Sequence, residues 1–244
     1  MQLTPGGKII YRDAQKIIRF SRRSVEEARA AMAAEEKVFC VGTSLLNPAK
    51  VFMDLWAKAG EQFPGYRLHL VPFEDDHDGI LGVIGSLGEK FDFLVGVCDS
   101  RQWLDQCQML PLGHYRKMVA LPRSHPLANR ERLTLDDLEG ETLMMVPEGD
   151  SGVNDQIRAM LRSRHPGIRI EDTSQFYDVS VFNRCAETGK PLLTLECWKD
   201  VHPALKTLPV EWDYTIPYGL LYSLHPPEDV ERYVEVVRSL TEFP

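Results

Sequence analysis

Apolar and polar positions in the N-terminal segment of the chain recur with the period of a helix. Thr4 and Pro5 suit the N-cap and the first position of a helix, and no further proline occurs before Ala34. Apolar or small residues then recur every three or four positions, which predicts one long helix with a narrow apolar stripe. The other faces are heavily charged, which favours pairing with a second chain over packing on the chain's own body. The stripe comprises Ile10, Ala14, Ile17, Ser21, Val25, Ala28 and Met32.

Beyond this helix, short apolar runs alternate with amphipathic segments. The runs at 37–44, 66–73 and 91–97 predict strands, and the segments 47–63 and 76–87 predict the helices between them. A β-α-β-α-β order predicts a parallel sheet with helices on its faces.

A second series of the same kind follows. The runs at 142–148, 168–174 and 191–196 predict strands, and the segments 151–164 and 179–187 predict helices. The chain is therefore expected to form two similar α/β units. Open parallel sheets bind ligands at the carboxyl ends of their strands, so two facing units predict a ligand-binding cleft between them.

Two connections are expected to link these units. Two strand-like runs lie around Pro111 within 104–122, and the chain is expected to cross to the second unit near 121–123. It returns near 210–220, where a further strand and a closing amphipathic helix at 228–240 are predicted. The expected divisions are the first helix at 1–34, the first unit at 35–121, the second unit at 122–212, and the return strand with the closing helix at 213–244.

Composition and charge narrow the class of protein. The 244 residues are 43% hydrophobic, which is ordinary for a globular protein, and no apolar run is long enough to cross a membrane. The N-terminus lacks the layout of a signal peptide, and the five cysteines include no CxxC, so a cytoplasmic protein is expected. The net charge of −8 divides into +4 for residues 1–34 and −12 for the remainder. The first helix is thus the part suited to lie near a polyanion.

Signatures of catalysis and of metal binding are scarce. The sequence holds no GxSxG, HExxH or Walker lysine motif. The acidic residues at 74–78 surround His77, but carboxylates at the start of a helix are favoured by its dipole, which is the simpler interpretation. We therefore predict no catalytic activity, no cofactor and no metal. Cys98 follows a predicted strand and is the one thiol expected to face the cleft.

Several segments resemble those of LysR-type transcriptional regulators. The most specific is LPRSHPLANRERLTLDDLEGETLMMVPEG (121–149), which is similar to the family's hinge strand, its HPLA, its L-x-D-L-x-G and the apolar strand that follows. The segment LTPGGKIIYRDAQKII (3–18) looks like the end of the family's wing and the start of its linker helix. The segments 91–97 and 189–198 are similar to two further family strands, although Lys190 replaces a glycine.

This resemblance implies an α/β fold of two Rossmann-like subdomains of the periplasmic-binding-protein type, joined by two hinge strands and preceded by a long linker helix. It implies the effector-binding and oligomerising portion of a regulator, with a small-molecule effector, an organic carboxylate, and a homodimer or homotetramer. Promoter DNA would be bound only through the family's winged helix-turn-helix, expected upstream of residue 1, and no membrane partner is implied. A solute-binding protein of a transport system is the alternative, and it would require a signal or a lipid anchor. An enzyme with the same fold would require a convergent acid/base or nucleophile set.

Effector-binding residues are predicted from their position after strands, where loops and helix N-termini offer N–H donors to an anion. Capping of a helix is the alternative role for Ser44 and Ser151, and core packing is the alternative for Phe176 and Tyr177. Residues 146–161 contain no cysteine, so sensing by a thiol pair is not expected. The predicted effector residues are Thr43, Ser44, Asp99, Arg101, Gly149, Asp150, Ser151, Phe176, Tyr177, Thr194 and Glu196.

Overall fold

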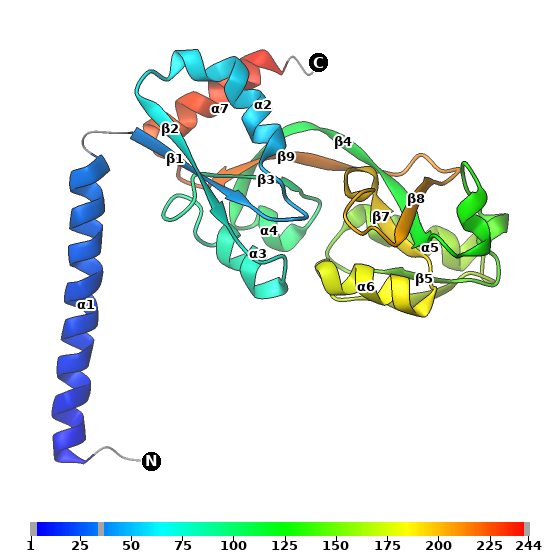
Figure 1. Cartoon of the computed structure of the whole chain (residues 1–244), viewed down its shortest axis with the longest axis horizontal. Coiled ribbons are helices and arrows are strands. Elements are labelled where there is room, and N and C mark those ends of the chain that lie inside the picture. Colours follow the sequence, from blue (N-terminus) through cyan, green and yellow to red (C-terminus); the bar gives the residue numbers. More distant parts are fainter. Residues whose placement is uncertain (1–3, 34–36, 242–244) are drawn as a thin grey trace.

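The computed structural model describes residues 4–33 and 37–241. Its first element is the helix α1 (Pro5–Ala33), and the hydroxyl of Thr4 caps it by accepting from the backbone N–H of Gly7 at 3.1 Å. Figure 1 shows α1 standing apart from the rest of the chain. The predicted long helix is therefore confirmed, and the chain's own body leaves its apolar stripe uncovered.

The described side chains of the α1 stripe are open to solvent. Ile10 and Ile17 are 72% and 67% exposed, and Ala14, Ser21 and Val25 are exposed as well. At 3.6 residues per turn, Tyr11 and Ile18 adjoin the stripe and widen it. Pairing of α1 with a second chain stays a prediction. The side chains of Ala28 and Met32 lie outside the described residues.

The first subdomain is built on five strands in the order β2-β1-β3-β9-β4. β1, β2 and β3 are parallel, as predicted; β9 pairs antiparallel with β3, and β4 pairs antiparallel with β9. α2 and α7 cover one face of this sheet, and α3 and α4 cover the other (Figure 1). Its elements are β1 (Lys37–Thr43), α2 (Lys50–Ala59), β2 (Tyr66–Pro72), α3 (His77–Ile84), β3 (Phe93–Val97), α4 (Arg101–Leu104), β4 (Cys107–Pro122), β9 (Thr215–Ser223) and α7 (Glu228–Leu240).

The second subdomain repeats this plan on the order β4-β7-β5-β6, with β8 on the other side of β4. β5, β6 and β7 are parallel, and α5 and α6 complete the predicted β-α-β-α-β series. Its core contains the fully buried Leu143, Ile157 and Leu161. Its elements are β5 (Thr142–Met145), α5 (Gly152–Arg164), β6 (Arg169–Asp172), α6 (Val179–Thr188), β7 (Leu192–Leu195) and β8 (Leu205–Pro209). Short 3-10 helices lie at Gly60–Gln62, Pro126–Asn129, Asp136–Leu138 and Glu196–Trp198.

One long strand joins the two sheets where two separate runs were expected. β4 pairs with β9 over 107–116, and from Lys117 onward it pairs with β7 and β8. A bulge between Pro111 and Gly113 absorbs the residues that resembled a turn, so the strand continues through them. Gly113 has φ of +156°, and a Cβ there would lie 2.8 Å from the ring of Tyr218.

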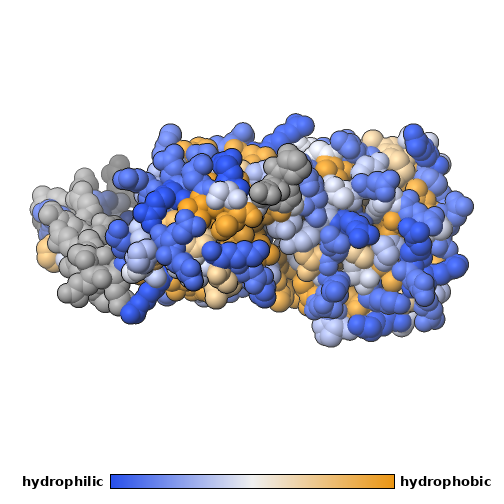
Figure 2. All heavy atoms as spheres, turned by 90° about the horizontal axis from the view of Figure 1, so that it is seen from above, coloured by the Kyte–Doolittle hydropathy of each residue, from blue (hydrophilic) through white to orange (hydrophobic). Residues whose placement is uncertain are grey.

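The change of partner in β4 comes earlier in the chain than the crossover expected near 121–123. β9 forms the returning connection, so the two predicted hinge strands are present and the predicted fold class is confirmed. The chain divisions at 34/35, 121/122 and 212/213 stay predictions. Figure 2 shows that polar and charged side chains dominate this face of the molecule, with apolar patches between them. No described helix combines the length and the apolar character needed to cross a bilayer.

Candidate functional site

A cavity of about 120 Å³ lies between the two subdomains, at the carboxyl ends of their parallel strands. Val97 ends β3, Leu195 ends β7, and Val146 directly follows β5. The two crossing strands close its floor through Lys117 of β4 and Ile216 of β9. The structure thus places a cleft where the strand order predicted one.

The two subdomains cap each other's helices on one side of this cavity. Asp99, in the first subdomain, accepts from the hydroxyl of Ser151 at 2.7 Å and from the backbone N–H of Val153 at 2.8 Å, at the start of α5. In return, Asp150 of the second subdomain accepts from the N–H of Gln102 at 3.1 Å, at the start of α4. These charge-assisted bonds hold the subdomains together.

A second set of contacts joins the subdomains elsewhere around the cavity. The indole of Trp198 donates to the carbonyl of Leu46 at 2.9 Å. The rings of Trp103 and Phe176 lie with their centroids 5.5 Å apart. The cleft in this structure is therefore bridged at several points, which is the arrangement of a closed domain.

Lys117 is the one Lys or Arg among the described residues that line the cavity, and only 6% of its surface is exposed. Its ammonium lies within ion-pair distance of no carboxylate in the described part of the chain. Burial lowers the pKa of Lys117 to about 8, and Asp99 opposes this shift. A buried cation without a neutralising partner has a strong preference for an anionic ligand.

Three further polar side chains of the cavity are buried and lack a hydrogen-bond partner within the described chain. They are Nε1 of Trp103, Oδ1 of Asn154 and Oγ1 of Thr194. Buried polar groups in proteins are nearly always paired, so unpaired groups gathered around one cavity indicate a place for a polar ligand.

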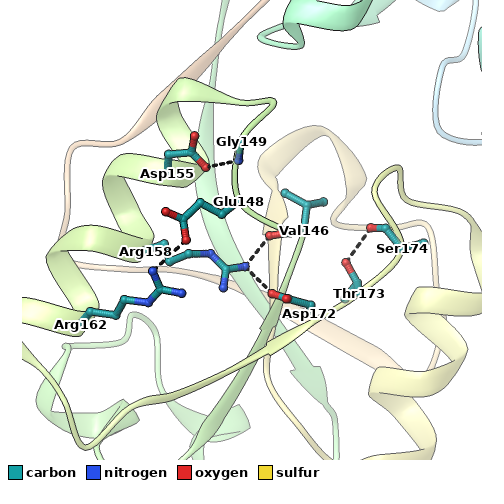
Figure 3. Close-up of polar contacts among 9 residues, drawn as sticks. All are labelled: Val146, Glu148, Gly149, Asp155, Arg158, Arg162, Asp172, Thr173 and Ser174. Atoms are coloured by element: carbon teal, nitrogen blue, oxygen red, sulfur yellow. Dashed lines mark hydrogen bonds and ion pairs between the residues drawn. The ribbon is translucent and has the colours of Figure 1, made fainter.

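In the second subdomain, one arginine binds to the loops that follow β5 and β6, and these loops carry the site residues of that subdomain (Figure 3). Arg158 of α5 is 4% exposed, and it donates to the carbonyl of Val146 and to Asp172, both at 2.6 Å. Val146 follows β5, and Asp172 ends β6. The guanidinium therefore fixes the starts of both loops. One turn further along α5, Arg162 reaches Glu148 at 2.8 Å in an exposed ion pair.

Six of the predicted effector residues line the cavity, from both subdomains. The ring of Phe176 faces Trp103, and Tyr177 donates to the carbonyl of Leu193 at 2.7 Å. Burial raises the pKa of Tyr177, which keeps its phenol neutral. Their roles in ligand binding stay predictions. The six are Asp99, Asp150, Ser151, Phe176, Tyr177 and Thr194.

Two of the predicted residues, Thr43 at the end of β1 and Ser44 directly after it, lie outside the cavity lining, and their hydroxyls bond to the loop before α2. Thr43 accepts from the backbone N–H of Ala49 at 3.1 Å. Ser44 accepts from the N–H of Asn47 at 3.0 Å and donates to Asp75. Capping of a helix was the alternative role predicted for Ser44, but α2 begins without a side-chain cap. Ser44 instead braces the loop between β1 and α2, and its role in ligand binding stays a prediction.

Three other predicted residues also lie outside the lining. The side chain of Arg101 is exposed. Gly149 has φ of +119° and donates its N–H to Asp155 at 3.0 Å. Glu196 accepts from the backbone N–H of Arg116 at 3.1 Å, so it braces the hinge strand. Gly149 and Glu196 therefore support a loop and a strand beside the cavity.

The thiol expected to face the cleft is turned away from it. Cys98 is 1% exposed and packs in the core with Trp103 and Cys107. Burial raises the pKa of Cys98 to about 12 and that of Cys107 to about 11, so thiolates are scarce at neutral pH. Among residues 4–33 and 37–241, no three His, Cys, Asp or Glu side chains gather as metal ligands.

Two α/β subdomains that are joined by two crossing strands and enclose a cavity define a ligand-binding domain of the periplasmic-binding-protein type. Residues 35–239 match the family model described as LysR substrate binding domain. Because this match covers most of the chain, the protein belongs to the LysR family and carries its effector-binding domain. The family is regulatory, and the match favours a regulator over the solute-binding alternative.

Solved structures share the fold at low sequence identity. CbnR, described as a LysR family transcriptional regulator, is 18% identical with a TM-score of 0.63, and the match covers 99% of this chain and 83% of that one. The effector binding domain of QuiR, in complex with shikimate, is 14% identical with a TM-score of 0.61, and the match covers 85% and 98%. The CcmR regulatory domain of Synechocystis PCC6803, in complex with 2-PG, is 14% identical with a TM-score of 0.53, covering 85% and 97%. No curated protein sequence matches significantly.

Proposed function

We propose that this protein is a cytoplasmic, non-catalytic sensor that binds a small organic carboxylate in the cleft between its subdomains. The observation that carries the proposal is Lys117, a buried ammonium at the cavity with no carboxylate of the described chain within ion-pair distance. A ligand carboxylate would neutralise it in a water-poor site, where an ion pair is strong. The shikimate complex of QuiR is consistent with an organic acid in such a cleft.

Ligand binding would act on the protein by shifting the balance between cleft arrangements. The capping of α5 by Asp99 and of α4 by Asp150 forms only when the subdomains are close. A ligand that bridges the two subdomains adds contacts to the same closed state and raises its population. Through an oligomer of this chain, that shift would be relayed to DNA-binding domains at a promoter.

Replacing Lys117 by methionine is expected to lower the affinity for a carboxylate ligand by about 100-fold, the loss of one buried charge-assisted pair. The measurement is calorimetric titration of the wild-type and variant chains with simple, 2-hydroxy, 2-oxo and 2-amino acids of about four to nine non-hydrogen atoms. The exposed Lys58→Met is the matched control and should bind as wild type does. Carboxylate binding that is equal in wild type and Lys117→Met would contradict the proposal.

Oligomerisation through α1 is a separate part of the proposal. Ile10 and Ile17 lie on one stripe of a helix that the chain's own body leaves open. Replacing both by glutamate is expected to convert an oligomer into monomers, because two charges would be buried in each paired helix. Sedimentation velocity measures this. A Glu replacement at the exposed Lys16, on the opposite side of the helix from the stripe, is the control. An unchanged mass for the Ile10/Ile17 variant would exclude α1 as the pairing surface.

A further inference from the structure

The charges around the cavity do not suit a simple anion alone. One ammonium, Lys117, lines the cavity together with three carboxylates, Asp75, Asp99 and Asp150. Asp75 uses both oxygens on the loop before α2, where it accepts from Ser44, from the N–H of Leu46 and from the amide of Asn47. Asp99 and Asp150 each use one oxygen on the opposite subdomain. Their remaining oxygens, Oδ1 of Asp99 and Oδ2 of Asp150, accept no hydrogen bond from the described residues.

The neutral polar groups of the cavity that lack a hydrogen-bond partner also include both donors and acceptors. Trp103 offers an indole N–H donor, and Asn154 offers the acceptor Oδ1, both 7% exposed. The hydroxyl of Thr194, 2% exposed, can donate or accept. The cavity therefore holds donors for an anionic group and acceptors for a cationic one. Asp99 and Asp150 are half-buried, and their free oxygens beside the cavity favour a ligand that carries a cationic group.

Size limits the ligand further. A cavity of roughly 150 Å³ holds a benzene molecule, so one of about 120 Å³ encloses about five non-hydrogen atoms, and the rest of a larger ligand would extend along the open cleft. An α-amino acid carries an ammonium and a carboxylate on the same carbon, so both charged groups lie within that size. It can present a carboxylate to Lys117 and an ammonium to Asp99 or Asp150 at once.

We infer that the ligand of this cleft is a small amino acid or a close amino-carboxylate, whose ammonium is recognised by Asp99 and Asp150. The inference rests on the proposed function, because Lys117 still receives the carboxylate. Beyond the proposed function, we expect the ligand's ammonium to contribute about as much to the affinity as the ligand's carboxylate does. The two aspartates would then join helix capping to ligand recognition, so that the bound ammonium strengthens the closed cleft.

The test compares isosteric ligands that differ in one group: alanine, lactate and propionate, with serine, glycerate and 3-hydroxypropionate as a second series and aspartate, malate and succinate as a third. Calorimetric titration of the full chain is expected to show amino acids binding about 10- to 100-fold tighter than the matched compounds without nitrogen. Asp150→Asn keeps an acceptor for the N–H of Gln102 and should reduce this preference at least about tenfold. Asp213→Asn, an exposed carboxylate away from the cavity, is the matched control and should leave the preference unchanged.

The outcomes separate the two claims. Lactate or propionate binding as tightly as alanine, with affinity still lost in Lys117→Met, overturns the amino-carboxylate inference and leaves the proposed function standing. A preference for amino acids that is identical in wild type and Asp150→Asn also overturns the inference. Absence of Lys117-dependent binding by every member of the three series overturns the proposed function together with the inference.

Discussion

Arg158→Ala is expected to lower the free energy of unfolding by about 2–3 kcal/mol, because the half-buried carbonyl of Val146 loses its donor and the packing of the buried Arg158 side chain is lost. The side chain of Asp172 is 57% exposed, so water can hydrate the carboxylate that remains, and we assign little of the cost to it. Chemical denaturation followed by circular dichroism measures the change.

The matched control for Arg158 lies on the same helix. Arg162 pairs with Glu148, but both side chains are 57% exposed, so Arg162→Ala should cost no more than about 0.5 kcal/mol. Equal costs for the two replacements would contradict a clamping role for Arg158.

Ligand binding by the folded Arg158 variants separates the role of Arg158 in positioning the loops from its contribution to stability. Arg158 holds the starts of the loops that carry Asp150 and Phe176, so its loss should weaken ligand binding at temperatures where the variant is fully folded. Arg158→Lys keeps the charge but lacks the planar fork that reaches two acceptors, and it should recover less than half of the lost affinity. Full recovery by lysine would show that charge alone is required.

The alternating α/β series was predictable because its central strands, β3, β5 and β7, are buried on both faces. β1, β3 and β7 read as continuous apolar runs, and short apolar runs between amphipathic segments have few other interpretations. β4 was harder, since Pro111 and Gly113 are turn-forming residues that a bulge can also accommodate. α4 and β8 escaped prediction because four or five residues carry too little periodicity.

Site residues at strand ends were predictable for the same topological reason. The carboxyl ends of β3 and β5 face each other across the cleft, which brings Asp99 and Asp150 to one cavity. Lys117 was not predicted, because it lies inside a strand and its exposure to the cavity depends on where β4 changes partner. A lysine directly before the apolar run 118–122 was the available signal, since an unpaired charge in a buried strand is costly. The unpaired state of Trp103, Asn154 and Thr194 depends on three-dimensional packing alone.

Lys117→Met is expected to raise the free energy of unfolding by about 3 kcal/mol at pH 7, although it removes a residue of the proposed site. Burial lowers the pKa of Lys117 in the folded protein to about 8, against an ordinary value of 10.5. Below pH 8 the folded protein must hold this charge in a poorly solvated place. Methionine has a similar length and carries no charge, so it relieves that cost.

The pH dependence of this gain has a definite sign. Between pH 8 and 10.5 the unfolded chain keeps its proton on Lys117 while the folded chain loses it, so the stability of the wild type rises with pH in that window. The advantage of Lys117→Met should therefore be largest at pH 7, shrink from about pH 8, and be nearly gone by pH 10.5. Urea denaturation at constant ionic strength measures it, with Lys58→Met as the exposed control, for which no such trend is expected.

An advantage that stays constant with pH, or a variant less stable than wild type at pH 7, would contradict a buried charge at Lys117. For Lys117→Met we expect a gain in stability together with a loss of ligand affinity, and these two effects have opposite signs. A variant that is more stable and yet binds the carboxylate about 100-fold more weakly cannot have lost binding through unfolding. The unpaired ammonium would then destabilise the free protein, and a ligand carboxylate that pairs with it would remove this destabilisation on binding.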